Sequence, residues 1–332
     1  MSIWNPLTWS HRVKIVVAFA SMYVIWGSTY LAIRVGLENA MPPSLLAGIR
    51  LVTAGLLMFA FARWRGYSLR MPRRELIITV IVGIFLLCGG MYFTVLAEQY
   101  VPSSLSALLV AVVPLWVASA EGLLPGMDRL TGRGILGLFI GFAGLGILMY
   151  PRITGIQGDE KQFIGIGLQL LATWLWTTGS IISKRNPIKT NGVVAVAWEM
   201  FAAGVILTFV GVVRGEVADL GGVSAAGVGA LLYLAVMGSC VAFTAFMWLL
   251  RNVPASKVMT YTYVNPVVAV FLGWSAGYVG LLPEPEPVNI WVVGGMTVIV
   301  LGVALTTSSP MKPSRRGEMP KEPDAEPALE LA

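Results

Sequence analysis

Aromatic side chains within long apolar runs are the residues of this chain best suited to bind an organic molecule. Tyr23, Trp26 and Tyr30 recur at i, i+3 and i+7, so a helix would place all three rings on one face. The candidate rings that other runs contribute are Tyr92, Trp176, Trp198 and Tyr261. Rings that converge between helices can line a cavity for flat or cationic molecules through stacking and cation–π contacts. Simple packing of rings between helices is the alternative explanation.

Three polar residues inside apolar runs extend this candidate site. Glu199 and Arg50 each lie well inside a run, where a charge is costly unless it is paired or faces water. We therefore consider Glu199 a substrate-binding or proton-carrying residue, with a structural ion pair as the alternative for both charges. Asn265 directly precedes Pro266, and its amide can donate and accept hydrogen bonds where a proline interrupts the helical ladder. It is the polar substrate contact that we expect.

Prolines and glycines in the middle of apolar runs predict bending points. Pro114 and Pro266 each remove a backbone N–H within a predicted helix, which predicts a kink there. Gly89 and Gly90 form a flexible stretch in another run. We expect these residues to act as hinges, although a kink can also be a static feature.

Motifs for other chemistries are missing from the sequence. No glycine-rich loop ends in Gly-Lys-Ser or Gly-Lys-Thr, so the chain has no ATP-binding P-loop. Its single histidine, His11, cannot form a His-Glu-x-x-His zinc site. We expect no metal, no cofactor and no enzymatic activity.

Composition places the apolar runs in a membrane. Hydrophobic residues make up 56% of the chain and charged residues 12%, against roughly 45–50% and about 25% in soluble domains. Runs of roughly 20 apolar residues can cross the hydrocarbon core, and in lipid such runs must be helical. The predicted fold is an all-α polytopic membrane protein with ten transmembrane helices. We place these spans near residues 13–37, 43–63, 75–99, 102–122, 133–150, 162–184, 192–213, 224–250, 254–278 and 288–307.

Basic residues orient the predicted spans. Lysines and arginines favour the cytoplasmic ends of spans, and most of the 23 in this chain fall on one side if the N-terminus is inside. Residues 1–12 then form a cytoplasmic N-terminal segment. Residues 308–332, rich in proline and charge, form a disordered cytoplasmic tail.

A duplication relates the two halves of the chain. Pro102-Ser103-Ser104 recurs as Pro254-Ala255-Ser256, and the only two cysteines are Cys88 and Cys240; both 254 − 102 and 240 − 88 give 152. Other pairs at or near this spacing are Pro114 with Pro266, Trp26 with Trp176, and Arg50 with Glu199. An odd number of spans per half requires the second half to enter the membrane upside down.

The duplication sets the predicted domain boundaries. Residues 13–150 form the first repeat, 151–161 an external linker and 162–307 the inverted second repeat. Inverted repeats of this kind are typical of secondary transporters, in which two related halves enclose a site and rock against each other.

These features together resemble the drug/metabolite transporter superfamily, specifically its ten-span family built from two five-helix EamA-type repeats. The segments that carry the resemblance are Ile25-Trp26-Gly27-Ser28-Thr29-Tyr30 followed by Arg34, Gly48-Ile49-Arg50-Leu51, and the stretch from Pro102 to Pro114 repeated from Pro254 to Pro266. The resemblance covers nearly the whole chain and implies a multi-pass carrier in the bacterial inner membrane that moves small metabolites, usually outward. Within the superfamily the chain is similar to the aromatic amino acid exporters, which implies a largely apolar central cavity.

The expected function is export of amino acids, aromatic and other apolar ones, by alternating access between the two repeats. An exporter of cationic drugs or other small metabolites is the main alternative, with Glu199 and the rings as its cation site. A passive channel is a further alternative, which the scarcity of polar residues in mid-span disfavours. The expected partners are a small-molecule substrate and the lipid bilayer, without nucleic acid, and the expected state is a monomer or weak homo-oligomer.

Overall fold

The protein is a bundle of helices. The computed structural model describes residues 10–101, 106, 109–124, 129–153, 160–278 and 290–312. Five helical runs in this part of the chain are long and apolar enough to cross a membrane: His11–Glu38, Pro43–Trp64, Arg73–Ala97, Gly192–Val213 and Ala225–Asn252. The all-α prediction is confirmed, apart from a two-residue antiparallel pair between β1 (Arg129–Leu130) and β2 (Met311–Lys312).

Helices occupy each of the predicted spans in the described residues. The first half contains α1 (His11–Glu38), α2 (Pro43–Trp64), α3 (Arg73–Gly83), η2 (Ile84–Met91), α4 (Tyr92–Ala97), α6 (Val113–Leu123), β1 (Arg129–Leu130) and α7 (Gly132–Ile153). The second half contains α8 (Glu160–Arg185), α9 (Gly192–Val213), η3 (Glu216–Gly222), α10 (Ala225–Tyr233), η4 (Leu234–Phe243), α11 (Thr244–Asn252), α12 (Ala255–Val258), α13 (Tyr261–Tyr278), α14 (Ile290–Ser308) and β2 (Met311–Lys312). α3, η2 and α4 form one continuous run, as do α10, η4 and α11.

Side-chain caps explain where several helices begin. Ser10 Oγ accepts a hydrogen bond from Val13 N at the start of α1. Asn191 Oδ1 accepts one from Val193 N at the start of α9. Each cap satisfies a backbone N–H that has no partner within its helix, which stabilises the helix at that residue.

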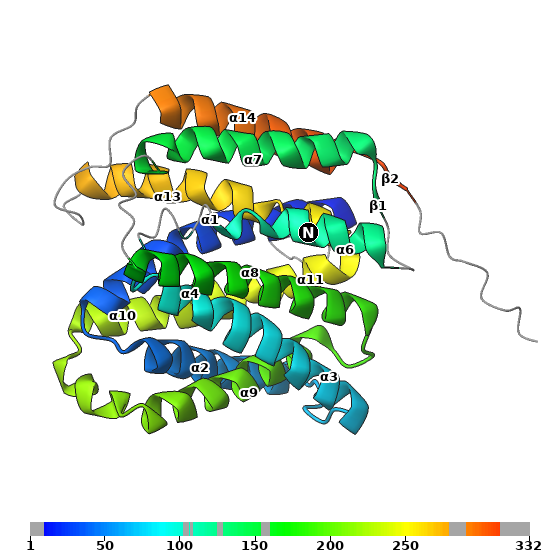
Figure 1. The fold of residues 1–332 in the computed structure, drawn as a ribbon. Coiled ribbons are helices and arrows are strands. Elements are labelled where there is room, and N and C mark those ends of the chain that lie inside the picture. Colours follow the sequence, from blue (N-terminus) through cyan, green and yellow to red (C-terminus); the bar gives the residue numbers. More distant parts are fainter. Residues whose placement is uncertain are drawn as a thin grey trace, which may run out of the picture.

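α2 and α9 pack against each other along one flank of the bundle, at the bottom of Figure 1. Small residues allow the approach: a Cβ atom on Gly55 would lie 2.8 Å from the backbone nitrogen of Phe201, and one on Gly204 would lie 2.5 Å from that of Val52. Contacts run in opposite directions along the two helices, so the pair is antiparallel. Close backbone approach at small residues is the usual way in which helices associate in lipid.

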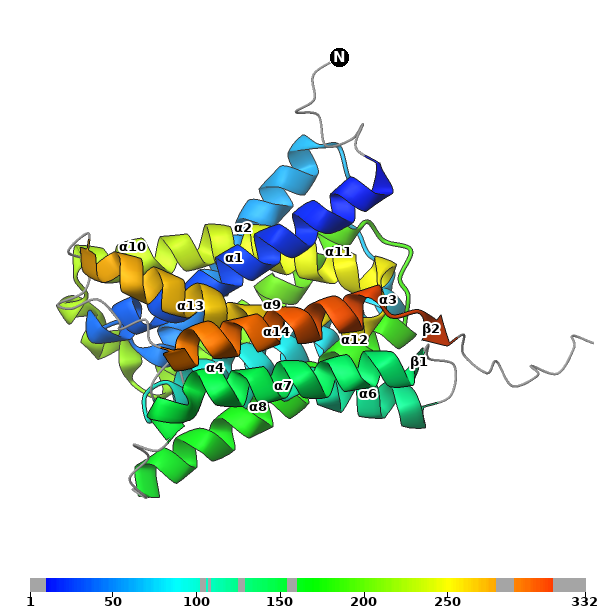
Figure 2. The same cartoon turned by 90° about the horizontal axis from the view of Figure 1, so that it is seen from above.

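α7 and α14 form the equivalent pair on the opposite flank. Both views show them side by side (Figures 1 and 2). A Cβ on Gly137 would meet the Thr306 backbone nitrogen at 2.7 Å, and one on Gly144 would meet that of Ile299 at 2.7 Å. Most of the remaining helices lie between these two pairs (Figure 1).

The two cysteines occupy equivalent places in the two halves. Cys88 Sγ in η2 donates to the Ala203 carbonyl of α9 at 3.6 Å, and Cys240 Sγ in η4 donates to the Ala54 carbonyl of α2 at 3.6 Å. Both thiols are free. Each half therefore presents its cysteine to the second helix of the other half, so the two halves contact each other reciprocally.

Two glutamates connect the repeats in the same reciprocal manner: each binds the backbone at or just before the start of a helix in the other repeat. The carboxylate of Glu216 in η3 accepts hydrogen bonds from Ser44 N at 2.9 Å, Ser44 Oγ at 2.6 Å and Leu45 N at 3.0 Å, at the start of α2. The carboxylate of Glu75 in α3 accepts from Lys189 N at 3.1 Å and Thr190 N at 3.0 Å, just before α9. Glu216 therefore binds free N–H groups in the first turn of α2 and complements the helix dipole, whereas Glu75 holds the loop that leads into α9.

One sequence prediction, the placement of Pro114, needs correction. Pro114 does not lie in mid-helix; it lies in the first turn of α6, where a missing N–H costs nothing and no kink is required. Within the predicted tail, Met311 and Lys312 pair with Leu130 and Arg129, and disorder of the tail stays a prediction. Residues 313–332, which make up most of the predicted tail, lie outside the described residues, as do 1–9, 102–105 and most of the predicted linker.

Candidate functional site

A cavity of about 90 Å³ lies at the centre of the bundle, and we call it the central pocket. It has room for several water molecules or a small organic group. Its walls come from α1, α2, η2, α4, α6 and α8 together with η4 and α13, so both halves of the chain contribute. The residues used below are Trp26, Thr29, Tyr30, Arg50, Gly90, Thr94, Gln169, Thr173, Trp176, Gly238, Ser239, Phe243, Tyr261 and Asn265.

Two equivalent tryptophans meet in this pocket. The rings of Trp26 and Trp176 are 5.6 Å apart at an interplanar angle of 79°, and Tyr261 lies 4.8 Å from Trp26. Trp26 Nε1 donates to the Gly238 carbonyl at 3.0 Å, whereas Trp176 Nε1 is buried without a hydrogen-bond partner in the described residues. The two indoles therefore have equivalent places in the repeat but different roles: one is held in place and the other offers a free donor.

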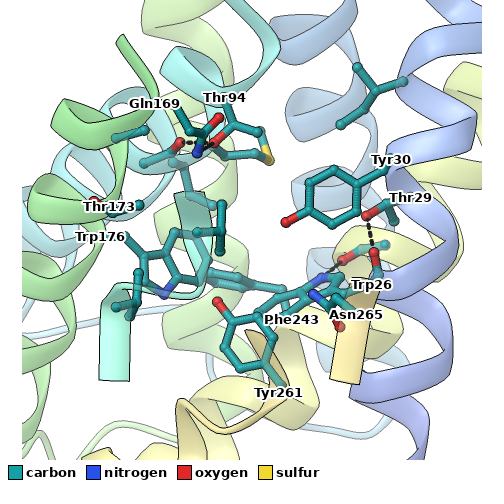
Figure 3. Close-up of a pocket in the computed structure, with 18 of the residues that line it drawn as sticks. Trp26, Thr29, Tyr30, Thr94, Gln169, Thr173, Trp176, Phe243, Tyr261 and Asn265 are labelled. Carbon is teal, nitrogen blue, oxygen red and sulfur yellow. Dashed lines mark hydrogen bonds between the residues drawn. The ribbon is translucent and has the colours of Figure 1, made fainter. Parts of the chain in front are cut away.

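Figure 3 shows the pocket with Tyr30 and Trp176 reaching into it from opposite sides. Asn265, directly before Pro266 in α13, is 1% exposed. Its Oδ1 atom has no hydrogen-bond partner among the described residues. An acceptor buried without a partner costs free energy, so it is well placed to receive a donor from a ligand or water.

Arg50 brings a buried positive charge to the wall of the pocket. Its side chain is 4% exposed, and its only hydrogen bond within the described residues runs from Nε to Ser239 Oγ at 2.9 Å. No carboxylate of the described residues forms an ion pair with it. The guanidinium has five N–H donors in a planar fork, so most of its capacity to bind an anion stays open.

Glycines shape the pocket by letting large side chains approach the backbone. A Cβ on Gly238 would lie 2.9 Å from Arg50 Nη2, and a Cβ on Gly90 would lie 2.7 Å from the Trp176 ring. The two glycines belong to η4 and η2, the π-helical segments of the two halves. π-Helical turns inside α-helices occur frequently at functional sites. Gly89 likewise packs against Leu175, so the predicted hinge glycines serve here as close contacts with α8, and bending at them stays a prediction.

A polar cluster closes another side of the pocket. Gln169 Nε2 donates to Thr94 Oγ1 at 3.1 Å, and Gln169 Oε1 accepts from Ser106 Oγ at 2.7 Å. Gln169 is fully buried, and lipid offers no hydrogen-bond partners, so these two hydroxyl groups supply the partners that its side-chain amide needs.

Family comparison gives the chain its place among known proteins. The model of the EamA-like transporter family matches twice, at residues 13–150 and 163–308. The chain belongs to the EamA-like transporter family. The predicted membership of the drug/metabolite transporter superfamily, with two EamA repeats, is confirmed.

Individual relatives agree with this family. The chain is 38% identical over 295 residues to the uncharacterized inner membrane transporter YedA of Escherichia coli, covering 87% of this chain and 89% of YedA. It is 24% identical to the uncharacterized transporter YoaV of Bacillus subtilis, covering 89% of this chain and 97% of YoaV. One crystal structure, described only as that of a protein, superposes with a TM-score of 0.71 at 20% identity over 90% of this chain and 97% of its own, which shows a shared fold. The chain is thus a multi-pass inner membrane protein, as predicted, and the transporter family disfavours an enzyme.

The structure brings together some of the residues predicted for the site of this EamA-like transporter and separates others. Those that line the central pocket are Trp26, Tyr30, Trp176, Tyr261 and Asn265. Tyr92 is buried elsewhere and shares a hydrogen bond of 2.7 Å with Ser44 Oγ. Trp198 Nε1 donates to the Leu69 carbonyl at 3.1 Å, near the end of the bundle where α3 begins.

Glu199 lines a second cavity, of about 270 Å³, that we call the Glu199 cavity. Its walls consist of Ile78, Thr79 and Val82 of α3, Ser183 and Lys184 of α8, residues 186–188 of the following loop, Glu199 of α9, and Leu250 and Arg251 of α11. None of the rings of the central pocket lines it. The predicted combination of Glu199 with the rings in one cation site is therefore not present among the described residues.

The sequence prediction missed several residues of the central pocket. Neither Gly238 nor Ser239 was singled out as a site residue from the sequence, and Gln169 was also passed over, although Gln169 is an amide in mid-span. The polar character of Gln169 was a usable signal, because a buried amide in lipid needs partners. Nothing in the sequence distinguished Phe243 from other apolar residues.

Proposed function

We propose that this protein exports amino acids with aromatic or other apolar side chains across the bacterial inner membrane by alternating access between its two repeats. Arg50 is the observation that carries the proposal. A buried guanidinium whose only described partner is a hydroxyl lacks a counter-charge. Such a charge is costly in a membrane protein unless an anion reaches it, and a substrate carboxylate supplies one through charge-assisted hydrogen bonds.

The other groups of the pocket complement the rest of an amino acid. Asn265 Oδ1 is a free acceptor for an ammonium group. Trp26, Trp176 and Tyr261 present ring faces and edges that an aromatic side chain can pack against. A cavity with a cation, a free acceptor and several rings matches the three parts of phenylalanine or tryptophan.

A cationic drug fits this pocket less well. The charge at its wall is positive, and like charges in a low-dielectric interior repel strongly. Glu199, the carboxylate that would attract such a drug, lines a different cavity. These observations support an anionic or zwitterionic cargo over a purely cationic one.

Ten spans with both termini in the cytoplasm complete the proposal. Support comes from the ten regions of the sequence in which helices were predicted and in which the described residues are helical. The distribution of lysine and arginine supports the orientation. A reporter enzyme that is active only in the periplasm, fused to the C-terminus, should stay inactive; activity would contradict this topology.

The functional proposal is tested by comparing cargo with and without a carboxylate. Purified protein in liposomes should take up labelled phenylalanine in a saturable manner, whereas phenylalaninamide should be taken up at least about tenfold more slowly, because a lost charge-assisted hydrogen bond is worth roughly 1.5–3 kcal/mol. Empty liposomes provide the background. Phenylalanine uptake equal to that background would refute the amino acid proposal, and equal uptake of acid and amide would refute the role of the carboxylate.

A further inference from the structure

The Glu199 cavity leads from the surface to a buried carboxyl group. Pro187 and Arg251 are exposed where the cavity meets the surface. Thr79 and Glu199, each 2% exposed, and fully buried Leu250 form its inner wall. Water can therefore enter from the end of the bundle at which α8 and α9 are joined and reach Glu199. By the lysine and arginine distribution, this end faces the cytoplasm.

Two polar atoms at the inner wall have no partner. Glu199 Oε2 and Thr79 Oγ1 are both buried and make no hydrogen bond with the described residues. A buried carboxylate needs a partner for its charge, whereas a protonated carboxyl group does not need an ion partner. The arrangement around Oε2 thus fits the protonated form of Glu199.

The same cavity offers a partner for the ionised form. Arg251 lies on α11 in the wall of the cavity, with its side chain exposed. Rotation of its long side chain toward Glu199 would pair the two charges when the proton leaves. We propose that Glu199 is a proton-binding site, exchanging its proton through this cavity, and that it couples proton movement to transport. The inference rests on the proposed transport activity but does not depend on an amino acid as the cargo.

Other charged groups around Glu199 are already engaged or lie at a distance along their helices. Lys184 Nζ on α8 donates to the carbonyls of Leu250 at 3.1 Å and Val253 at 2.7 Å. Glu75, on the first turn of α3, binds the backbone before α9. α2, which also packs along α9, carries no charged residue between Arg50 and Arg63. Arg251 is therefore the cation best able to respond to the charge of Glu199.

A close backbone contact connects Glu199 with the central pocket. A Cβ on Gly83 would lie 2.9 Å from the Glu199 carbonyl oxygen, so α3 and α9 are in contact at this residue. η2 begins at the next residue, Ile84, and contributes Gly90 to the central pocket. A shift of α9 that accompanies ion pairing would reach the π-helical segment directly, which gives the coupling a physical route.

Infrared spectroscopy of the purified full-length protein tests the proton site without any cargo. The wild type at neutral pH should show the carbonyl stretch of a protonated carboxylic acid, and Glu199→Gln should lose it. Glu38→Gln is the matched control, because Glu38 has 59% of its side chain exposed and pairs with Arg34 near the end of α1. Arg251→Gln should keep the band, since it removes only the partner of the ionised form. A wild-type spectrum without the band, or a band unchanged in Glu199→Gln, would overturn the proton site.

A pH gradient across liposomes tests the coupling. A lumen one pH unit more acidic than the outside should raise the accumulation of labelled phenylalanine by up to about tenfold if one proton is exchanged for each molecule, since a tenfold ratio corresponds to 1.4 kcal/mol. Glu199→Gln and Arg251→Gln should both lose the response, measured as the ratio of accumulation with and without the gradient. Equal accumulation by the wild type with and without the pH gradient would overturn the coupling. If the wild type fails to move phenylalanine at all, the amino acid proposal fails, and the infrared band still decides whether Glu199 holds a proton.

Discussion

The two repeats of this transporter are alike where they hold the fold together and different where they face a cavity. Cys88 and Cys240 make the same contact with the opposite half, at the same distance of 3.6 Å. Arg50 and Glu199 also occupy equivalent positions, in α2 and α9, yet one is a cation at the central pocket and the other a carboxyl group in a separate cavity. Equivalent positions that keep the same residue therefore make structural contacts, whereas equivalent positions with different residues are the candidates for substrate or proton binding.

The equivalent tryptophans show the same contrast within one cavity. Trp26 binds the Gly238 carbonyl, and its position is set by the protein. Trp176 packs edge-on against it with a free N–H. A ligand thus meets one fixed ring and one ring that still needs a hydrogen bond, although both descend from the same position of the repeat.

Removal of the Arg50 charge should have the largest effect on uptake, because it removes the cation that distinguishes the central pocket from the Glu199 cavity. We expect Arg50→Gln to lower phenylalanine uptake at least about tenfold, since a hydrogen bond to a charged group contributes roughly 1.5–3 kcal/mol. Arg50→Lys, which keeps the charge but loses the fork geometry, should fall between this variant and the wild type. Initial uptake rates in liposomes measure both.

Arg34→Gln is the matched control for Arg50. The Arg34 side chain is 52% exposed and pairs with Glu38 on the surface of α1, so uptake should stay at the wild-type rate. Uptake by Arg50→Gln at the wild-type rate would make the guanidinium a structural group and remove the difference between the two halves.

Glu216 and Glu75, each of which binds the backbone of the other repeat, test the contacts that the two repeats have in common. Glu216→Gln should lower the free energy of unfolding by about 2 kcal/mol, because a buried carboxylate that accepts bonds from Ser44 and Leu45 loses its charge. Glu75→Gln should lower the free energy of unfolding less than Glu216→Gln does, because water reaches the hydrogen bonds of Glu75 more easily. Thermal unfolding in detergent measures both, and both variants should keep the discrimination between phenylalanine and its amide. A larger loss of stability for Glu75→Gln than for Glu216→Gln would contradict this ranking by burial.

Much of the fold could be predicted from the sequence because lipid leaves few choices for an apolar run. The spans predicted at 43–63 and 192–213 match α2 and α9 within a residue. Pro114 was misplaced because its segment breaks into a turn before α6, and a proline suits a first turn as well as it marks a kink. The π-helical segments η2 and η4 have no simple sequence signal apart from the small residues within them.

The candidate site was harder to predict because composition does not reveal which way a side chain points. Trp26, Trp176 and Asn265 line the central pocket, and the repeat with its mid-span proline pointed to them. Tyr92 and Trp198 have the same residue types but find hydrogen-bond partners elsewhere. A shift of one residue rotates a helical side chain by about 100°, so a tyrosine or tryptophan in the correct span can still face a neighbouring helix.

The pairing of α2 with α9 and of α7 with α14 has a consequence for how the two halves of this chain can differ. Each of these helices packs against its own counterpart from the other repeat. An interface of that kind is isologous, the type that joins two identical subunits around a two-fold axis. Two identical five-helix units would each have to carry the same residue on both sides of such an interface. Because both copies lie in one chain here, a single substitution can place a cation at one position without placing a second cation at its counterpart.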